Sequence, residues 1–279
     1  MKAYKGFDEN LKCRDFQYEI GKEYEEKTAS LCNNGFHACE YPLDCFFYYS
    51  PAKSRFCEVE LEDNGERNSD DSKVCGTRIK IGAEIGIPGL VKAAIEYVTE
   101  RAKPSNRHHT KGSRSANSAT GYGSANSATG YGSANSATGD WSANSATGYG
   151  SANSATGSRS ANSATGDWSA NSATGDGSAN SATGYGSANS ATGYGSANVT
   201  TGSDSSNNGE GERNICVAWG KNNKCKGSVG SFLVLSEWGS WDGNKYPFIG
   251  ATMVEVDGVN IKADTYYSLI DGKVVECGD

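Results

Sequence analysis

Proline and long apolar stretches are both scarce in this sequence. The chain has 5 prolines against 36 glycines in 279 residues, which excludes a collagen-like helix and a proline-rich linker. No apolar run approaches the ~20 residues of a membrane-spanning helix, so we expect no membrane association. Met1 to Lys5 lead into polar sequence without the apolar core of a secretory signal. We therefore expect a cytoplasmic protein.

An excess of positive charge is also missing. The formal net charge is −7, whereas binding to a nucleic-acid backbone usually needs a basic stripe. We therefore expect no direct nucleic-acid binding, although an acidic surface is compatible with a basic protein partner. The 9 cysteines are an odd number, which in a chain without a signal peptide favours reduced thiols over a disulfide framework.

The middle of the chain is a strict nine-residue repeat. The unit Ser-Ala-Asn-Ser-Ala-Thr-Gly begins at Ser115, Ser124, Ser133, Ser142, Ser151, Ser160, Ser169, Ser178 and Ser187, and an altered unit begins at Ser196. An altered last copy is common where a repeat array meets a cap. Disordered sequence has no need of such strict phase, so we favour a β-solenoid over residues 115–202.

Variation between units is confined almost wholly to the two residues that separate them. The fixed small residues predict an extended rung, and the glycine before each variable pair predicts a tight corner. Nine residues barely close a ring, so we expect two units per coil. The array would then form about five coils and a rod on the order of 25 Å long.

The inward face of each rung follows one of two alternations. Either Asn117, Ala119 and Gly121 point inward, or Ala116, Ser118 and Thr120 do. We favour the first, because the segment 216–220 beyond the array continues the same Ala-x-Gly register. Inward asparagines would form a hydrogen-bonded ladder along the rod.

Two units per coil place the corners on two opposite edges. One edge would carry Tyr122, Asp140-Trp141, Ser158-Arg159, Asp176 and Tyr194, and the other Tyr131, Tyr149, Asp167-Trp168 and Tyr185. Aromatic residues interspersed with acids are typical of a recognition surface. The alternative is that these side chains only cover the rod or contact a second copy of it, so homo-oligomers remain an open alternative.

The repeat resembles the head repeats of trimeric autotransporter adhesins, which form left-handed parallel β-rolls. The resemblance covers the array alone and its unit length differs. It implies a solenoid and self-association, but not surface adhesion.

Residues 1–103 are expected to form an α+β domain. The predicted strands are Lys2–Phe7, Phe16–Lys22, Gly35–Cys39, Arg55–Glu62 and Val74–Ile81, with a short helix over Pro42–Tyr49. A longer helix over Pro88–Lys103 is predicted from the 3.6-residue spacing of its apolar residues and from the proline at its start.

Four segments of this domain have a recognisable pattern: Tyr4–Asp8, Cys13–Glu19, Gly35–Cys39 and Asp71–Val74. Together they resemble an N-terminal domain of unknown function that recurs in phage and prophage proteins, often before short Ser-Ala-Thr-Gly repeats. The resemblance implies a phage or prophage origin rather than a known activity. Tyr4–Gly6 and Gly35–His37 also resemble the opening of ADP-ribosyltransferase folds, with Lys5 in place of the usual arginine and without a Glu-x-Glu motif.

The cysteines and the histidine of this domain invite chemistry. Cys32, His37, Cys39 and Cys45 lack the knuckle spacing of structural zinc sites, so we expect buried thiols and no metal or other cofactor. A His37–cysteine nucleophile pair would need a third, orienting group, and the sequence identifies none. We assign no catalytic residue.

The array is flanked by a basic segment, 104–114, expected to be a hinge, and by a small all-β cap over 203–279. Ser203–Arg213 is expected to be a loop, followed by degenerate rungs at Ile215–Gly220 and Lys226–Ser236. Asp257-Gly258 and Asp271-Gly272 predict two-residue hairpin turns. Trp238 and Trp241 lie in a predicted long hairpin loop, either as an exposed contact or folded back.

The predicted fold is thus mainly β, with a solenoid between an α+β domain and a cap. We expect a non-enzymatic binding protein that presents the solenoid to a host protein, such as a defence component. The residues expected to bind are Tyr122, Tyr131, Trp141, Tyr149, Arg159, Trp168, Tyr185, Tyr194, Trp238 and Trp241. Two alternatives stay open: an enzyme in the N-terminal domain, favoured by any polar pocket around His37, and a structural virion or assembly protein.

Overall fold

The computed structural model describes residues 1–68, 71–101 and 107–278. It divides into two compact units, Met1–Ala94 and Ile95–Asp279. Strands hold 51% of the residues and helices 9%, and the middle of the chain is a β-solenoid of about 7 turns. The expected fold class is therefore confirmed.

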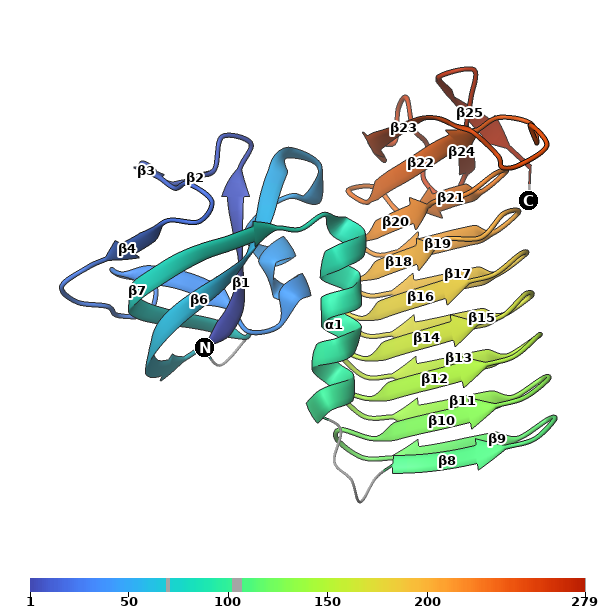
Figure 1. Ribbon diagram of the computed structural model, residues 1–279, viewed down its shortest axis with the longest axis horizontal. Coiled ribbons are helices and arrows are strands. Elements are labelled where there is room, and N and C mark those ends of the chain that lie inside the picture. Colours follow the sequence, from blue (N-terminus) through green and yellow to red (C-terminus); the bar gives the residue numbers. More distant parts are fainter. Residues whose placement is uncertain (69–70, 102–106, 279) are drawn as a thin grey trace. The chain divides into compact units, whose positions relative to one another are not determined.

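The first unit is built on a five-stranded sheet in the order β4-β7-β5-β1-β6, in which β7 also pairs with β6. Its strands are β1 (Lys2–Asp8), β4 (Glu23–Glu25), β5 (Phe36–Cys39), β6 (Ser54–Arg67) and β7 (Lys73–Glu84). The strands β1, β4, β6 and β7 are labelled in Figure 1. The short strands β2 (Lys12–Cys13) and β3 (Phe16–Gln17) form a separate ladder, and the helical elements are η1 (Pro42–Phe47) and η2 (Pro51–Lys53). The helix α1 (Ile87–Arg101) begins in the first unit and ends in the second.

One strand prediction in this unit was wrong in its extent, and one helix prediction was confirmed. The strand expected over Phe16–Lys22 is reduced to β3, because the chain turns at Gly21, whose φ of 83° suits glycine. The short helix expected over Pro42–Tyr49, with Pro42 in its first turn, is present as the 3-10 helix η1, which ends at Phe47. The end of the helix predicted to reach Lys103 lies outside the described residues, since α1 is described to Arg101.

The solenoid consists of two parallel sheets, and the chain crosses from one sheet to the other at every corner. The first solenoid sheet contains β8 (Arg107–Lys111), β10 (Ala125–Thr129), β12 (Ala143–Thr147), β14 (Ala161–Thr165), β16 (Ala179–Thr183), β18 (Ala197–Thr200), β20 (Ile215–Ala218) and β22 (Phe232–Trp238). The second solenoid sheet contains β9 (Ala116–Thr120), β11 (Ala134–Thr138), β13 (Ala152–Thr156), β15 (Ala170–Thr174), β17 (Ala188–Thr192), β19 (Ser206–Glu210) and β21 (Lys224–Gly227).

Register within each sheet confirms two repeat units per coil. Ala125 pairs with Ala143, and Ala134 pairs with Ala152. Each residue therefore stacks on the residue eighteen positions further along the chain. The rod is longer than the ten copies because flanking segments also form rungs. Arg107–Lys111, expected to be a hinge, is strand β8 paired with β10, and the expected loop after the array contains strand β19 paired with β17. Both segments can extend the ladder because parallel pairing needs backbone groups rather than the repeat's side chains.

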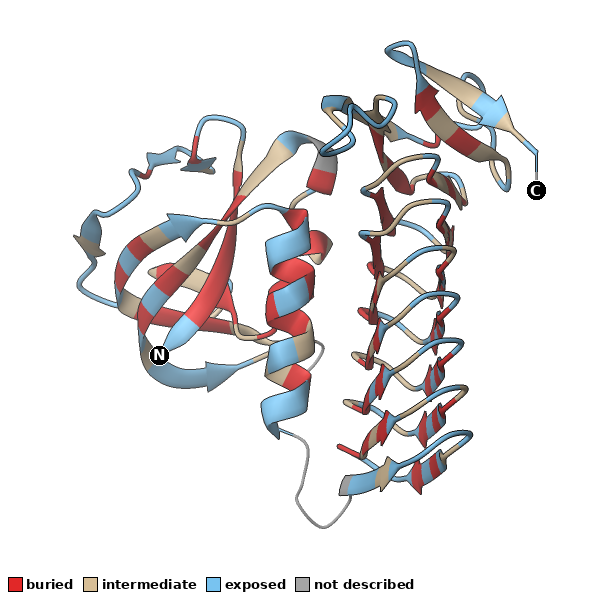
Figure 2. Ribbon diagram, turned by 45° about the vertical axis from the view of Figure 1, so that its right-hand side comes forward, coloured by how far each residue is buried: buried red, intermediate tan, exposed pale blue. Residues whose placement is uncertain are grey.

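The asparagine and the second alanine of each Ala-Asn-Ser-Ala-Thr strand are buried inside the rod, as predicted, and the serine between them is exposed or half-buried. Figure 2 shows the resulting alternation of buried and exposed positions along the strands. The amide of Asn135 donates to Asn153 Oδ1 at 2.9 Å and to the Ser145 carbonyl at 2.8 Å. Asn153 repeats both bonds to Asn171 and Ser163. The interior is thus held by continuous amide ladders, because alanine methyl groups alone bury little apolar surface.

A hydrophobic plug closes the C-terminal end of the rod. The two asparagine ladders end on thiols, with Asn198 donating to Cys216 Sγ and Asn207 to Cys225 Sγ. Both cysteines belong to a buried cluster with Leu233 and Leu235 of β22 and with Tyr267. The strands β23 (Phe248–Glu255), β24 (Tyr266–Ile270) and β25 (Lys273–Cys277) then pair antiparallel and end the parallel stack.

The two turn predictions in the cap had different outcomes. Asp271 and Gly272 form the β24–β25 turn with φ of 50° and 69°, as predicted. No strand follows Asp257-Gly258 among the described residues up to Asp264. The Asp257 carboxylate instead accepts the backbone N–H groups of Val259, Asn260 and Ile261, and this local hydrogen bonding competes with strand pairing.

Candidate functional sites

The second edge column consists of Tyr131, Tyr149, Trp168 and Tyr185, and all four side chains are exposed. Their exposed fractions are 55, 49, 55 and 47%. The Tyr131 and Tyr149 rings stack with centroids 5.5 Å apart, and Trp168 meets Tyr185 edge to face at 5.6 Å. The column is therefore an ordered strip of aromatic surface.

The first edge column is more enclosed. Tyr122 is 59% exposed, whereas Trp141, Arg159 and Tyr194 are half-buried. The Arg159 guanidinium lies 5.4 Å from the centre of the Trp141 ring, which is within cation–π range. Each pair of corners is also joined through the backbone, as from Trp141 N to Ser158 O.

The acidic residues of both columns have a structural task. Asp140, Asp167 and Asp176 each accept the backbone N–H of the next corner on their own edge, from Ser158, Tyr185 and Tyr194 respectively. Their carboxylates therefore fasten successive corners together. The aromatic residues and Arg159, not the acids, remain as candidates for recognition.

Three of the bulky corner residues have an unfavourable backbone conformation. The second residue of a corner is usually glycine, as at Gly132 and Gly150, where φ is 65° and 67°. Trp141, Arg159 and Trp168 occupy this position with φ of 60°, 55° and 58°. Such φ values cost a non-glycine residue roughly 1–2 kcal/mol. Strain of this kind often accompanies function.

A third aromatic surface, the cap patch, surrounds the β22–β23 hairpin. Trp219, Trp238 and Phe248 form one ring cluster, with Trp219 stacked on Phe248 at 5.3 Å. Trp241 contacts Tyr246 in the hairpin loop and is 57% exposed. Trp238 is half-buried and donates to Ser236 Oγ. Sequence reasoning missed Trp219 and Phe248, because neither belongs to the repeat or to the predicted loop.

The first unit contains a pocket of about 570 Å³ between β1, β5 and the segments around them. On one side β1 pairs with β6 over seven positions. On the other side its pairing with β5 is given by one residue pair, Tyr4 with Cys39. Lys5, Phe36, His37, Tyr48 and Tyr49 are among the lining residues. The pocket, with polar and aromatic lining residues, lies where β1 and β5 are no longer paired.

Lys5 is the unexpected residue of this pocket, because it is buried in the middle of β1. Its side chain is 5% exposed. Nζ donates to the His37 carbonyl oxygen at 2.8 Å and contacts Cys13 Sγ at 3.7 Å. Burial lowers the pKa of Lys5 below its ordinary value, since the charged form is desolvated. The sequence signal was a lysine in the middle of a strand, with Ala3 and Phe7 two residues away on the same face.

The His37 side chain is hydrogen-bonded to the backbone of Cys32, not to a cysteine thiol. Its Nε2 accepts the backbone N–H of Cys32 at 3.0 Å, so the proton of the neutral ring lies on Nδ1. Burial, followed by the charges of Lys5 and Lys73, lowers the pKa of His37. Among the described residues no group of three or more His, Cys, Asp or Glu is placed to hold a metal ion.

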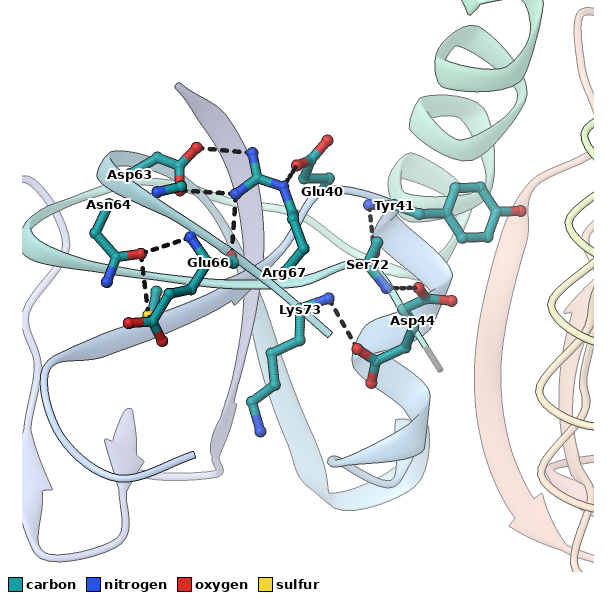
Figure 3. A network of polar contacts seen from close by, with 12 residues as sticks. Glu40, Tyr41, Asp44, Asp63, Asn64, Glu66, Arg67, Ser72 and Lys73 are labelled. Atoms are coloured by element: carbon teal, nitrogen blue, oxygen red, sulfur yellow. Dashed lines mark hydrogen bonds and ion pairs between the residues drawn. The ribbon is translucent and has the colours of Figure 1, made fainter. Parts of the chain in front are cut away.

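A polar network next to the pocket residue Lys73 joins η1 to the start of β7 (Figure 3). The buried carboxylate of Asp44 accepts the backbone N–H of Ser72 at 2.7 Å, while Ser72 Oγ accepts that of Tyr41. Asp71 binds the N–H of Lys73 and the Tyr48 hydroxyl. Lys73 Nζ lies 4.2 Å from the centre of the Tyr48 ring. The network therefore fixes Tyr48 and Lys73 at the rim.

No helix in the part of the chain that the structure describes is long and apolar enough to cross a membrane. Neither the curated proteins nor the solved structures include a significant match to this chain. Residues 1–93 match the family model described as "Domain of unknown function (DUF7666)". The match ends where the first compact unit ends, at Ala94, so the chain is similar to this family over its first unit and continues as a β-solenoid.

Proposed function

We propose that the chain is a non-enzymatic binding protein, encoded by a phage or prophage, whose solenoid edges bind a host protein in the host cytoplasm. A component of host defence is the target class that we favour. The repeat supplies a rigid rod, and the corners supply aromatic side chains at fixed spacing. Aromatic residues and arginine are the side chains that most often dominate protein interfaces.

The observation that carries this proposal is the backbone strain at Trp141, Arg159 and Trp168. Glycine fits these corners without strain and occupies them in other copies. These side chains make contacts within the chain, Trp141 with Tyr97 of α1 and with Arg159, and Trp168 with Tyr185. We take contact with a partner as the reason for side chains of this size at three left-handed positions.

The test replaces both tryptophans by the glycine of the other copies. The tagged full-length chain and its Trp141→Gly/Trp168→Gly variant are exposed to bacterial host lysate, and captured proteins are identified. The protein captured by the parent chain is then purified, and its Kd for both chains is measured. Ser154→Ala on the exposed outer face of β13 is the matched control.

We expect the double glycine variant to weaken binding by at least roughly tenfold, which is the effect of losing interface hot spots of ~1.4 kcal/mol or more. The control should bind like the parent chain. Equal Kd values for all three chains would disprove the role of the edges. Capture of nothing except the chain itself would favour self-assembly instead.

An enzyme in the first unit is the second candidate, and the pocket lined by His37 is the observation that favours it. The two segments that carry the resemblance to ADP-ribosyltransferases, Tyr4–Gly6 and Gly35–His37, both line this pocket. The His37 side chain is engaged with the Cys32 backbone, which weakens its case as a base. Incubation with NAD and a host lysate tests this candidate: transfer of label to a protein would establish it, and its absence at saturating NAD would exclude that reaction.

A further inference from the structure

The pocket of the first unit contains a buried cation without a matching carboxylate. Lys5 Nζ has a carbonyl oxygen at 2.8 Å and a thiol sulfur at 3.7 Å as its hydrogen-bond partners. In the described part of the chain no carboxylate forms an ion pair with it. Nζ also lies 5.5 Å from the centres of the Phe7 and Tyr18 rings, within cation–π range. An ammonium group offers three donors, and none of these partners carries a full negative charge.

Burying an ammonium group is costly unless an opposite charge or a full set of hydrogen bonds compensates it. The flanking residues of β1, Ala3 and Phe7, are both fully buried and apolar. A methionine or leucine would satisfy the packing of this strand at lower cost. The lysine therefore points to a compensating group that enters the pocket.

The remaining lining indicates the chemistry of that group. Phe16, Tyr18 and Phe36 form an aromatic wall, in which Tyr18 and Phe36 are buried and Phe16 is 40% exposed. Arg14 and Lys73 add positive charge to the lining, while Asp15 and Glu26 are its acidic members. Three cations against two acids in a chain of net charge −7 favour an anionic ligand, and aromatic walls favour a flat apolar body. A volume of about 570 Å³ suits a small organic molecule.

We propose that this pocket binds a small organic oxyanion, a carboxylate or phosphate attached to a planar ring, with the anionic group on Lys5 Nζ and the ring against Phe16. The His37 carbonyl and the β1 backbone hold Lys5 in place for this contact. The proposal does not depend on partner binding by the solenoid edges, since it concerns residues of the first unit alone.

Calorimetric titration of the full-length chain with two probes, phenyl phosphate and benzoate, tests the proposal and distinguishes the two oxyanions. Inorganic phosphate and phenol separately test the anionic group and the ring. We expect one ring-bearing anion to bind at least roughly tenfold more tightly than either fragment, because both parts contribute. Lys5→Met should weaken that binding at least tenfold, and Lys80→Met, an exposed lysine outside the lining, should not change it.

A second measurement covers the case in which Lys5→Met does not fold. In the parent chain the NMR resonance of the Lys5 side-chain ammonium should shift on titration with the probe that binds. Binding that leaves this resonance unmoved would overturn the proposal, as would unchanged affinity in a folded Lys5→Met variant. Failure of both ring-bearing anions to bind by about 10 mM, where a site would be weaker than ~3 kcal/mol, would also overturn it. None of these outcomes bears on capture of a host protein by the edges.

Discussion

Gly157 stacks on Gly139 of the preceding coil, at the corners that follow the strands of the second solenoid sheet. A Cβ atom built on Gly157 would lie 2.5 Å from the Gly139 carbonyl carbon, and the φ of Gly157 is 120°. Gly150 also has a positive φ, 67°, but a Cβ there meets nothing within 4 Å. A side chain at Gly150 would therefore meet only conformational strain, whereas one at Gly157 would also overlap the backbone of the neighbouring coil.

Gly157→Ala should destabilise the chain more than Gly150→Ala. The latter adds left-handed strain of roughly 1–2 kcal/mol, and the former adds an overlap with backbone that typically costs a further ~1–3 kcal/mol. Urea unfolding followed by circular dichroism measures the difference. Equal midpoints for the two variants would show that the corners can separate to admit a methyl group.

The asparagine ladder predicts a large penalty for a small deletion. Asn153→Ala leaves three groups without their hydrogen-bond partner: the side-chain amide of Asn135, the side-chain oxygen Oδ1 of Asn171 and the backbone carbonyl of Ser163. Each buried group left without a partner costs ~1–3 kcal/mol. Ser154→Ala, one residue away and exposed, should stay within about 0.5 kcal/mol of the parent. Similar unfolding free energies for both variants would mean that the ladder contributes little.

Trp168 should reverse the usual order of alanine and glycine. Glycine in place of alanine usually destabilises a strand by roughly 0.5–1 kcal/mol. At the φ of 58° of Trp168, Trp168→Gly relieves strain that Trp168→Ala retains, so the glycine variant should be the more stable of the two by about 1 kcal/mol. A lower thermal midpoint for Trp168→Gly than for Trp168→Ala would show that the corner is not strained, and the main support for the binding proposal would be lost.

Lys5 predicts a pH-dependent stability difference. Burial lowers its pKa in the folded chain below the ordinary 10.5, so the unfolded chain binds more protons between the two values. Stability contributed through Lys5 therefore rises with pH over that window. Lys5→Met should be more stable than the parent at low pH, and the difference should diminish as the pH approaches 10.5. Chemical unfolding at several pH values, with Lys80→Met as control, measures it. A constant difference between Lys5→Met and the parent would contradict the lowered pKa.

The period of the repeat was enough to predict the rod, its two units per coil and its inward asparagines. Each of these follows from chain geometry: strands alternate, corners need glycine, and polar side chains inside must pair with one another. The rungs at β8 and β19 were missed because their side chains differ from the repeat. Parallel pairing is a backbone property, and a charged segment such as Arg107–Lys111 gives no periodic signal of it.

The candidate sites were less accessible to sequence reasoning. The edge columns followed from the period, but the φ values of Trp141 and Trp168 did not, because they depend on the turn that the coil imposes. Lys5 gave a weak signal that is ambiguous in one sequence, since a lysine in a strand usually faces solvent. Its burial depends on how β1 and β5 part after the Tyr4–Cys39 pair, which is set by tertiary packing.

Two repeat units per coil give the array a parity. Loss or gain of eighteen residues would leave every later corner on its own edge and shorten or lengthen the rod by one coil. Loss or gain of a single nine-residue unit would move each later corner to the opposite edge and turn the cap by half a coil about the rod. A change by an even number of units would therefore alter only the length of the rod, whereas a change by an odd number upstream of Trp168 would bring Trp168 and the cap patch onto the other side of the rod.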